Sequence, residues 1–203
     1  MAKKSKAPFP YGPETDGFDH INILAGKAKT TIGNRLSHFT NTPFIHPYYG
    51  AFASMEGFWH YISTGYKHEE LRGLSGLTAK QFSRGLKKML YIDFCEDILS
   101  GNYQKIIQDE RLAQMVVESE LPFTHYYLFD DPTERSGYRV VLTRENAWLC
   151  KGLEEIRAAL KAGEVPKCWK NAALRYARNV ANGIPPQGTY TPPPKPEDEE
   201  QAK

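Results

Sequence analysis

Large apolar side chains recur every three to four residues from Ser54 to about Tyr66. Met55, Trp59 and Ile62 would lie on one face of a helix with this spacing. Ser54 offers a side-chain oxygen suited to the N-cap, where it can accept a bond from a free backbone N–H. The segment is therefore predicted to form a helix that buries this face.

Further helices are indicated by the same kind of pattern. One is expected to begin at Thr78, because Thr78 and Gln81 have the spacing of a capping box, with Phe82, Leu86 and Leu90 on one face. Residues 91–118 are predicted to form one helix, or two with a break at Gly101 and Asn102. Two more helices are expected near the end, one capped by Thr143 and stopped by Gly163, the other over residues 167–182 with Gly183 after it.

Short β-rich stretches alternate with these helices. Ile21–Leu24 is a strand candidate, and Phe44–Ile45, between Pro43 and Pro47, is expected at a sheet edge. The aromatic and β-branched stretches 125–129 and 138–142 flank a polar turn and predict a hairpin. Together the elements predict an α+β fold, a mainly helical single domain with a small sheet.

The two ends of the chain differ from the middle in composition. Residues 1–17 hold Lys, Pro, Gly and Asp with few large aliphatic residues, which indicates a disordered leader. Residues 184–203 combine proline with acid, so a disordered tail is expected there. The domain is thus assigned to residues 18–183. A protein partner that binds the tail as a polyproline segment is an alternative to a plain tail.

Composition and charge narrow the class of protein. The chain has 203 residues and a net charge of +2, too little to argue for nucleic-acid binding. The spacing of its three cysteines is wide, and Cys95 and Cys150 are expected in the core, as in a reducing compartment. We see no signal peptide and no apolar run long enough to cross a membrane, so a cytoplasmic location is expected.

Glu56 is the acidic residue of an aromatic and apolar stretch, residues 51–62. A carboxylate in such surroundings favours a pocket wall and acid–base chemistry, whereas a plain helix-capping role is equally compatible with the local sequence. His60 follows four residues later and would share a helix face with Glu56. Such a pair could position a hydroxyl or a water, although a tethered core histidine fits the pattern as well.

A loop candidate with two lysines follows the first strand. Residues 26–33 begin and end with glycine and include Lys27 and Lys29, but they lack the residue order of a phosphate-binding P-loop. The lysines could meet a phosphate or a sugar aldehyde, or the loop could simply be solvated. No histidine spacing typical of a metal site occurs, and no metal or cofactor is expected.

Taken in order, several short motifs resemble the NADAR/YbiA family over roughly residues 20–160. They are a strand at 21–23, Arg-Leu-Ser-His-Phe at 35–39, Pro-Phe at 43–44, Ala-Ser-Met-Glu at 53–56, the stretch 71–80, and the helix segment 146–157. The resemblance implies a YbiA-like α+β fold. It also implies hydrolysis of an N-glycosidic bond, in an ADP-ribosylated base or in a ribosylated nucleotide or metabolite.

The resemblance also implies roles for individual residues. Glu56 matches the family's motif glutamate, which would stabilise the cationic sugar, and Lys27 or Lys29 could supply an amine that captures the opened sugar. The residues expected to bind the ligand are Asn22, Arg35, Ser37, His38, Phe39, Trp59 and His60. The partner would then be a small molecule or an ADP-ribosylated nucleic-acid base.

Four features depart from the family pattern. The family's Trp-Gly segment near the second pair of strands is absent, and residues 125–127 and 136–137 stand in that region. His38 stands where the motif has asparagine, Gly57 where a histidine follows the glutamate, and Ser63 where a lysine lies further along the helix. These departures keep two alternatives to an N-glycosidase open. One is a non-catalytic ADP-ribose- or nucleotide-binding module with a degenerate site, and the other is a structural or interaction protein.

Overall fold

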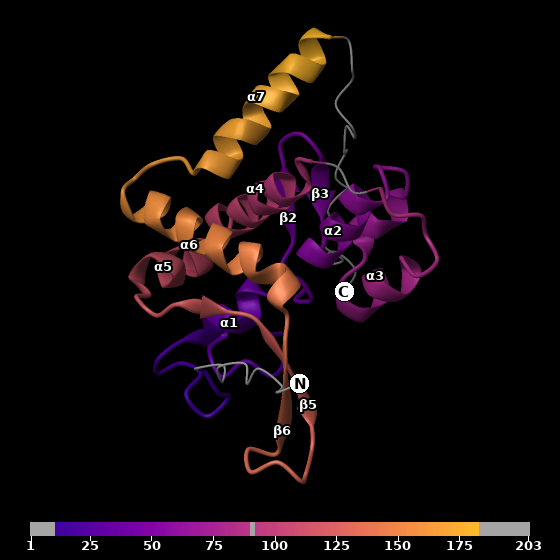
Figure 1. The fold of residues 1–203 in the computed structure, drawn as a ribbon. Helices are drawn as coiled ribbons and strands as arrows, with labels where there is room; N and C mark the ends of the chain where they lie inside the picture. Colours follow the sequence, from indigo (N-terminus) through magenta and orange to yellow (C-terminus); the bar gives the residue numbers. More distant parts are fainter. Residues whose placement is uncertain (1–10, 90–91, 183–203) are drawn as a thin grey trace, which may run out of the picture.

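The computed structural model describes residues 11–89 and 92–182 (Figure 1). Within these ranges the chain forms an α+β fold of seven α-helices and three two-stranded sheets. The helices are α1 (Thr31–Leu36), α2 (Met55–Ser63), α3 (Gly76–Phe82), α4 (Phe94–Ile107), α5 (Glu110–Glu118), α6 (Ala147–Lys161) and α7 (Lys167–Ala181), with two 3₁₀ turns, η1 (Glu69–Gly73) and η2 (Arg144–Asn146). The strands are β1 (Ile21–Asn22), β2 (Phe44–His46), β3 (Gly50–Phe52), β4 (Phe123–Thr124), β5 (Tyr126–Asp130) and β6 (Tyr138–Leu142).

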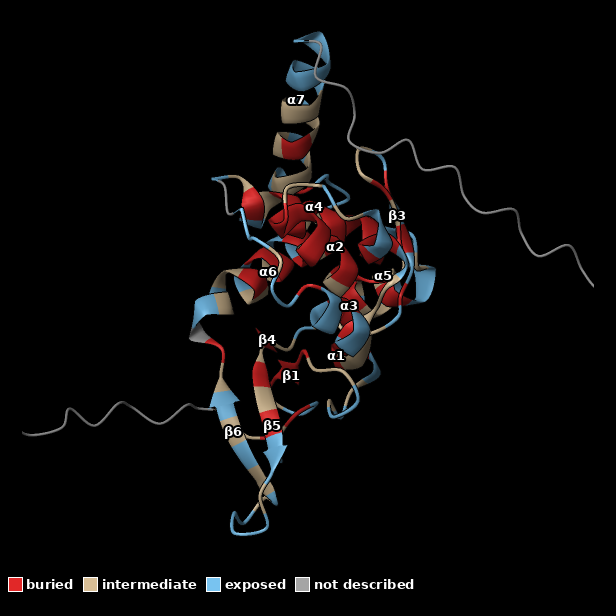
Figure 2. Ribbon diagram, turned by 90° about the vertical axis from the view of Figure 1, so that its right-hand side faces the viewer, coloured by how far each residue is buried: buried red, intermediate tan, exposed pale blue. Residues whose placement is uncertain are grey.

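Helix α4 lies at the centre and joins two apolar clusters. Ile98 packs with the side chains of α2 and the β2–β3 hairpin, whereas Tyr103 and Ile106 pack with those of α1, α5 and α6. Figure 2 shows the buried residues concentrated on α2 and α4. The helices touch at Gly101, where a Cβ would lie 2.5 Å from a ring carbon of Phe58. Only glycine permits this approach, which holds α2 in a fixed place.

The three sheets are small and separate. β1 pairs in parallel with β4, and the Asn22 side chain bonds both the N–H and the C=O of Tyr126, at 3.0 and 3.2 Å. β2 and β3 form a hairpin against α4. β5 and β6 form a second hairpin, which projects from the body at the end opposite α7 (Figures 1 and 2).

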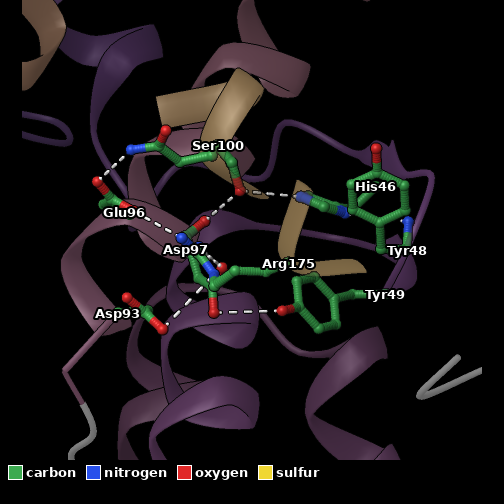
Figure 3. A network of polar contacts seen from close by, with 9 residues as sticks. His46, Tyr48, Tyr49, Asp93, Glu96, Asp97, Ser100 and Arg175 are labelled. Carbon is green, nitrogen blue, oxygen red and sulfur yellow. Dashed lines mark hydrogen bonds and ion pairs between the residues drawn. The ribbon is translucent and has the colours of Figure 1, made fainter. Parts of the chain in front are cut away.

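Helix α7 is attached to α4 by charge and to the turn between β2 and β3 by stacked rings. Arg175 lies 2.6 Å from Glu96 and 2.5 Å from Asp97, with Asp93 at 3.7 Å (Figure 3). The Tyr48 ring stacks on both Trp169 and Tyr176. The helix predicted for residues 167–182 is therefore confirmed, and it is part of the packed domain.

Several sequence predictions are confirmed, although the helix predicted to follow Ser54 is shorter than expected. Ser54 caps α2 by accepting from the Gly57 N–H at 3.0 Å. The helix ends at Ser63 instead of Tyr66, because Gly65 and Tyr66 adopt positive φ angles of 74° and 63°. The 125–142 hairpin is present, and α6 buries Leu149, Leu153 and Ile156 as predicted.

Other boundaries were wrong. α3 begins at Gly76 after Ser75, not at Thr78, and ends at Phe82, so Leu86 is not on it. Leu90 lies outside the described residues. The break between α4 and α5 falls at Gln108–Asp109 rather than at Gly101, because Asp109 caps α5 by accepting from Leu112 N–H. Helix α6 is preceded by Asn146, while Thr143 instead bonds the His125 carbonyl.

One α-helix and two strands were not predicted at all. α1 occupies part of the stretch read as a loop, capped by Thr30, and β3 and β4 are too short to leave a pattern. Cys95 is exposed, not buried, because it faces away from the core in the first turn of α4.

The ends of the domain assignment fall partly outside the described residues, namely 1–10 and 183–203. Within the expected leader, Asp16 is buried and accepts from the backbone N–H groups of Asn22 and Lys29 at 2.9 and 2.8 Å. The contacts of the domain therefore reach back at least to Asp16.

Candidate functional site

A pocket of about 460 Å³ opens between α2, α3 and β5. Its wall gathers segments that are distant in the sequence: the loop after β1, the turn after α1, one face of α2, and the start of β5. It is lined by Ile23, Leu24, Ala25, Lys27, Ser37, His38, Phe39, Glu56, Trp59, His60, Lys80, His125, Tyr127, Leu128, Asn146 and Leu149. Its volume is within the range of small-molecule sites.

Glu56 is placed in the pocket by the start of α2. Its side chain is 12% exposed, and its backbone N–H donates to the carbonyl of His38 at 2.9 Å. This bond attaches the turn after α1 to the first turn of the helix. Because an N-terminal turn is the favourable end of the helix dipole for an anion, the carboxylate suits this position electrostatically as well.

His60 lies one helical turn further along and contacts Glu56. Its Nε2 is 3.1 Å from Oε1 of Glu56, and its Nδ1 is 3.2 Å from Nζ of Lys88. Since no described side chain bonds Oε2 of Glu56, that oxygen remains available to a ligand. The helical spacing that suggested the Glu56–His60 pair is therefore realised as a contact.

His38 forms the neighbouring wall as a neutral donor. The side-chain nitrogen of Asn102 donates to its Nε2 at 3.1 Å, which leaves the ring proton on Nδ1. Burial lowers the pKa of His38, and the positive charge of Lys105 lowers it further. The ring also contacts Trp59, with centroids 5.8 Å apart. The pocket wall therefore carries a neutral N–H donor at His38.

Behind this wall lies the fully buried Lys105. Its ammonium donates to the Ser37 carbonyl at 2.9 Å, and burial together with nearby Arg35 lowers its pKa to about 7. Lys105 therefore holds the turn that carries Ser37, His38 and Phe39, although it does not line the pocket.

His125 faces the same pocket from the other side. Its Nδ1 donates to the Ile23 carbonyl at 2.7 Å, so its Nε2 is an acceptor. Burial lowers the pKa of His125, which keeps the ring neutral near pH 7. Tyr127 packs against it at 5.1 Å between ring centroids.

Two lysines supply positive charge at the pocket. Lys80 lies 5.4 Å above the Phe39 ring and has no ion-pair partner within the described ranges. Lys27 lines the pocket but donates to Asp130 at 2.8 Å and to the Leu128 carbonyl at 3.3 Å. Lys80 is thus the less engaged of the two cations.

Of the ten residues singled out from the sequence, seven line this pocket: Lys27, Ser37, His38, Phe39, Glu56, Trp59 and His60. The other three lie outside it. Asn22 joins β1 to β5, Lys29 donates to the Glu14 carbonyl at 2.9 Å, and Arg35 is paired with Asp109.

Lys80, His125, Tyr127 and Asn146 were not recognised as site residues. For His125 and Tyr127 a signal existed, because alternate residues of a strand point to one face. For Lys80 and Asn146 the local sequence offers none, since an exposed lysine and an asparagine before a helix are ordinary features.

Neither a metal cluster nor a membrane helix is found in the part of the chain that the structure describes. No three His, Cys, Asp or Glu side chains gather there as metal ligands would. None of the described helices combines the length and apolar character needed to cross a membrane.

Comparison with known proteins gives one weak likeness. No family model matches the sequence, and no curated protein matches it significantly. Among solved structures, the chain is similar to the NMR structure of the E. coli protein YbiA, with 14% identity and a TM-score of 0.49. The alignment covers 75% of this chain and 95% of that one. A likeness at this level assigns neither family nor activity.

Proposed function

We propose that this protein hydrolyses an N-glycosidic bond in an ADP-ribosylated base or in an ADP-ribose-like or ribosylated nucleotide. The observation that carries the proposal is the place of Glu56. Its carboxylate lies in a pocket of ligand size, among the rings of Phe39, Trp59 and Tyr127, and no described side chain bonds its second oxygen. The motif order around Glu56 in the sequence points to the same chemistry.

The reaction would use the pocket residues as follows. The bond between the anomeric carbon and the base nitrogen breaks, its electron pair leaves with the base, and positive charge develops on the sugar. Oε2 of Glu56 stabilises this charge. Water then adds to the anomeric carbon and loses a proton to Nε2 of neutral His125, which passes it to the departed base, so that free sugar and free base are both neutral.

The pocket offers matching partners to the two ends of such a ligand. Aromatic rings suit a flat base, and Lys80 with Lys27 suits phosphate oxygens. The hydroxyl of Ser37 and the ring Nδ1–H of His38 could bond ribose hydroxyls. The arrangement differs from the one expected from sequence, because Lys29 and Arg35 take no part in it.

A binding module without turnover is the second candidate. It is favoured by Lys27, whose ammonium is already bound to Asp130 and Leu128 and is therefore not free to capture an opened sugar. The replacement of the motif asparagine by His38 favours it too. Such a module would keep affinity for ADP-ribose and lack hydrolysis.

The deciding experiment is a mass-spectrometric screen of the purified protein against ADP-ribosylated guanine and nucleotide pools. Release of a free base by the wild type, and not by Glu56→Gln, is the expected result. Binding without base release would support the second candidate. Neither binding nor release would overturn both and favour an interaction protein that uses its tail.

A further inference from the structure

The side chain of His60 contacts two groups, one at each ring nitrogen. Nε2 faces Oε1 of Glu56 at 3.1 Å, and Nδ1 faces Nζ of Lys88 at 3.2 Å. His60 itself is only 9% exposed. Lys88 comes from the segment after α3, which is held against the end of α2 by the bond from Met89 N–H to the Ser63 carbonyl at 2.6 Å.

The chemistry of these three groups permits one arrangement of protons. An ammonium can only donate, so Nδ1 of His60 must accept from Lys88. The proton of the neutral ring is then on Nε2, where it is donated to the Glu56 carboxylate. We propose that Lys88 is a positioning residue, which fixes the tautomer of His60 and, through it, the orientation of Glu56.

The tautomer of His60 is inferred from geometry alone, whereas its effect on catalysis rests on the proposed function. With Oε1 of Glu56 bonded to His60, Oε2 stays free to meet the sugar. If His60 carried its proton on Nδ1, its Nε2 lone pair would face the carboxylate and repel it. Glu56 would then turn away, and the stabilisation of positive charge at the sugar would be lost.

The surroundings of Lys88 support an interaction with the site. Burial lowers the pKa of Lys88, while the negative charge of Glu56 raises it. The ammonium and the carboxylate lie at the two nitrogens of one imidazole ring. Because Lys88 is an exposed residue, its removal should leave the fold intact. The backbone bond from Met89 to Ser63 does not depend on this side chain.

The tautomer of His60 can be read directly from the ¹⁵N chemical shifts of its ring nitrogens, without any substrate. In the wild type we expect the Nε2–H form, and a predominant Nδ1–H form would overturn the proposal. Glu56 also favours the Nε2–H form, so the effect of Lys88 is isolated in a Glu56→Gln background. There we expect Glu56→Gln to keep the Nε2–H form, and Glu56→Gln/Lys88→Met to populate both forms.

Two further double variants test whether the position of the lysine and its positive charge are both required. Glu56→Gln/Lys87→Met removes an exposed neighbouring lysine and should leave the tautomer unchanged. Glu56→Gln/Lys88→Arg should retain the Nε2–H form, because a guanidinium also only donates. Identical ring shifts in Glu56→Gln and Glu56→Gln/Lys88→Met would overturn the positioning role, whatever the activity of the protein.

Kinetics then connect the tautomer to the proposed function. With a substrate found by the screen, Lys88→Met should lower kcat at least tenfold and change KM less than threefold, and Lys88→Arg should restore most of kcat. Full activity of Lys88→Met would contradict the positioning role while leaving the role of Glu56 intact. Loss of activity in Glu56→Gln alone tests the proposed function separately.

Discussion

Glu56 and His60 lie one turn apart on α2, and Oε1 of Glu56 is 3.1 Å from Nε2 of His60. Both side chains are nearly buried, at 12% and 11% exposure, yet both line a pocket. The contact uses one carboxylate oxygen and leaves the other for a ligand. A helix cap would not need this arrangement, because Ser54 already performs that function.

Glu56→Gln is expected to abolish turnover and to preserve the fold. The substitution keeps the shape of the side chain and removes the charge that would stabilise the cationic sugar, raising the barrier by roughly 3–4 kcal/mol, as for the loss of one stabilising group in other active sites. Base release measured by mass spectrometry and thermal denaturation of the same sample check the two parts of the prediction.

Glu70→Gln is the matched control, because Glu70 is exposed and does not line the pocket. Its activity should equal that of the wild type. If Glu56→Gln remained fully active on an identified substrate, Glu56 would have no part in the chemistry. A large fall in melting temperature would instead show that its role is structural.

ADP-ribose should bind and raise the melting temperature, since a ligand selective for the native state stabilises it. Lys80→Met should raise the Kd about tenfold, or by about 1.4 kcal/mol, the scale of one hydrogen bond to a charged group. Lys29→Met should have no effect, because Lys29 lies outside the pocket. Calorimetry at two salt concentrations is the measurement.

The difference between Lys80→Met and the wild type should shrink in high salt, because screening weakens the charge–charge contribution. Ribose and guanosine, which lack phosphate, should bind more weakly than ADP-ribose. Equal binding of all three ligands would exclude a phosphate subsite at Lys80, and equal losses in Lys80→Met and Lys29→Met would remove the distinction between the two lysines.

Gly57→Ala should destabilise the protein by about 1–3 kcal/mol, the usual cost of adding a methyl group to a filled core. A Cβ at Gly57 would lie 2.3 Å from the Leu71 carbonyl oxygen and 2.8 Å from that of Leu74. Gly73→Ala is the control, since no atom lies within 4 Å of its Cβ position. Chemical denaturation of both variants measures the difference, and equal stabilities would contradict the packing argument.

The same clash explains a departure noted in the sequence. The motif has a histidine after its glutamate, but here backbone from η1 passes so close to α2 that no side chain fits at Gly57. His38 and His125 reach the pocket from two other segments, both as neutral rings.

The sequence predicted the helices with a long apolar face and the hairpin, because burial on one side leaves a periodic pattern. Among the residues expected to bind a ligand, Ser37, His38, Phe39, Trp59 and His60 line one pocket, although they come from two separate motifs. The sequence did not predict β3, β4 or the break at Asp109. These depend on pairing with distant segments and on one side-chain cap, which leave no local period.

The basic residues show most clearly what the sequence alone could not predict. Lys27, Lys29 and Arg35 are equivalent in the sequence as cations near a motif. In the structure each binds a different partner: Asp130, the Glu14 carbonyl and Asp109, respectively. Lys80 and Lys88 come from a segment that looks like an exposed surface. Which cation serves the pocket is decided by tertiary contacts, which local sequence does not encode.

The buried side chain of His46 makes the stability of the protein sensitive to acid. Its ring is fully buried, with Nε2 donating to Ser100 at 3.0 Å and Nδ1 accepting from Tyr48 N–H at 3.2 Å (Figure 3). Protonation of Nδ1 would break the bond to Tyr48 and place a charge in the core. Burial accordingly lowers the pKa of His46 to about 3.

Acid should therefore favour unfolding, because the unfolded chain binds this proton below about pH 6.5 whereas the folded protein does not. From pH 7 to pH 4.5, His46 alone should reduce the free energy of unfolding by roughly 2–3 kcal/mol. His46→Gln should be less stable at pH 7 but lose less stability over this interval. His68→Gln, which changes a half-buried histidine at the surface, should keep the wild-type slope. Urea denaturation at several pH values measures the slopes, and parallel curves for His46→Gln and the wild type would exclude His46 as the source.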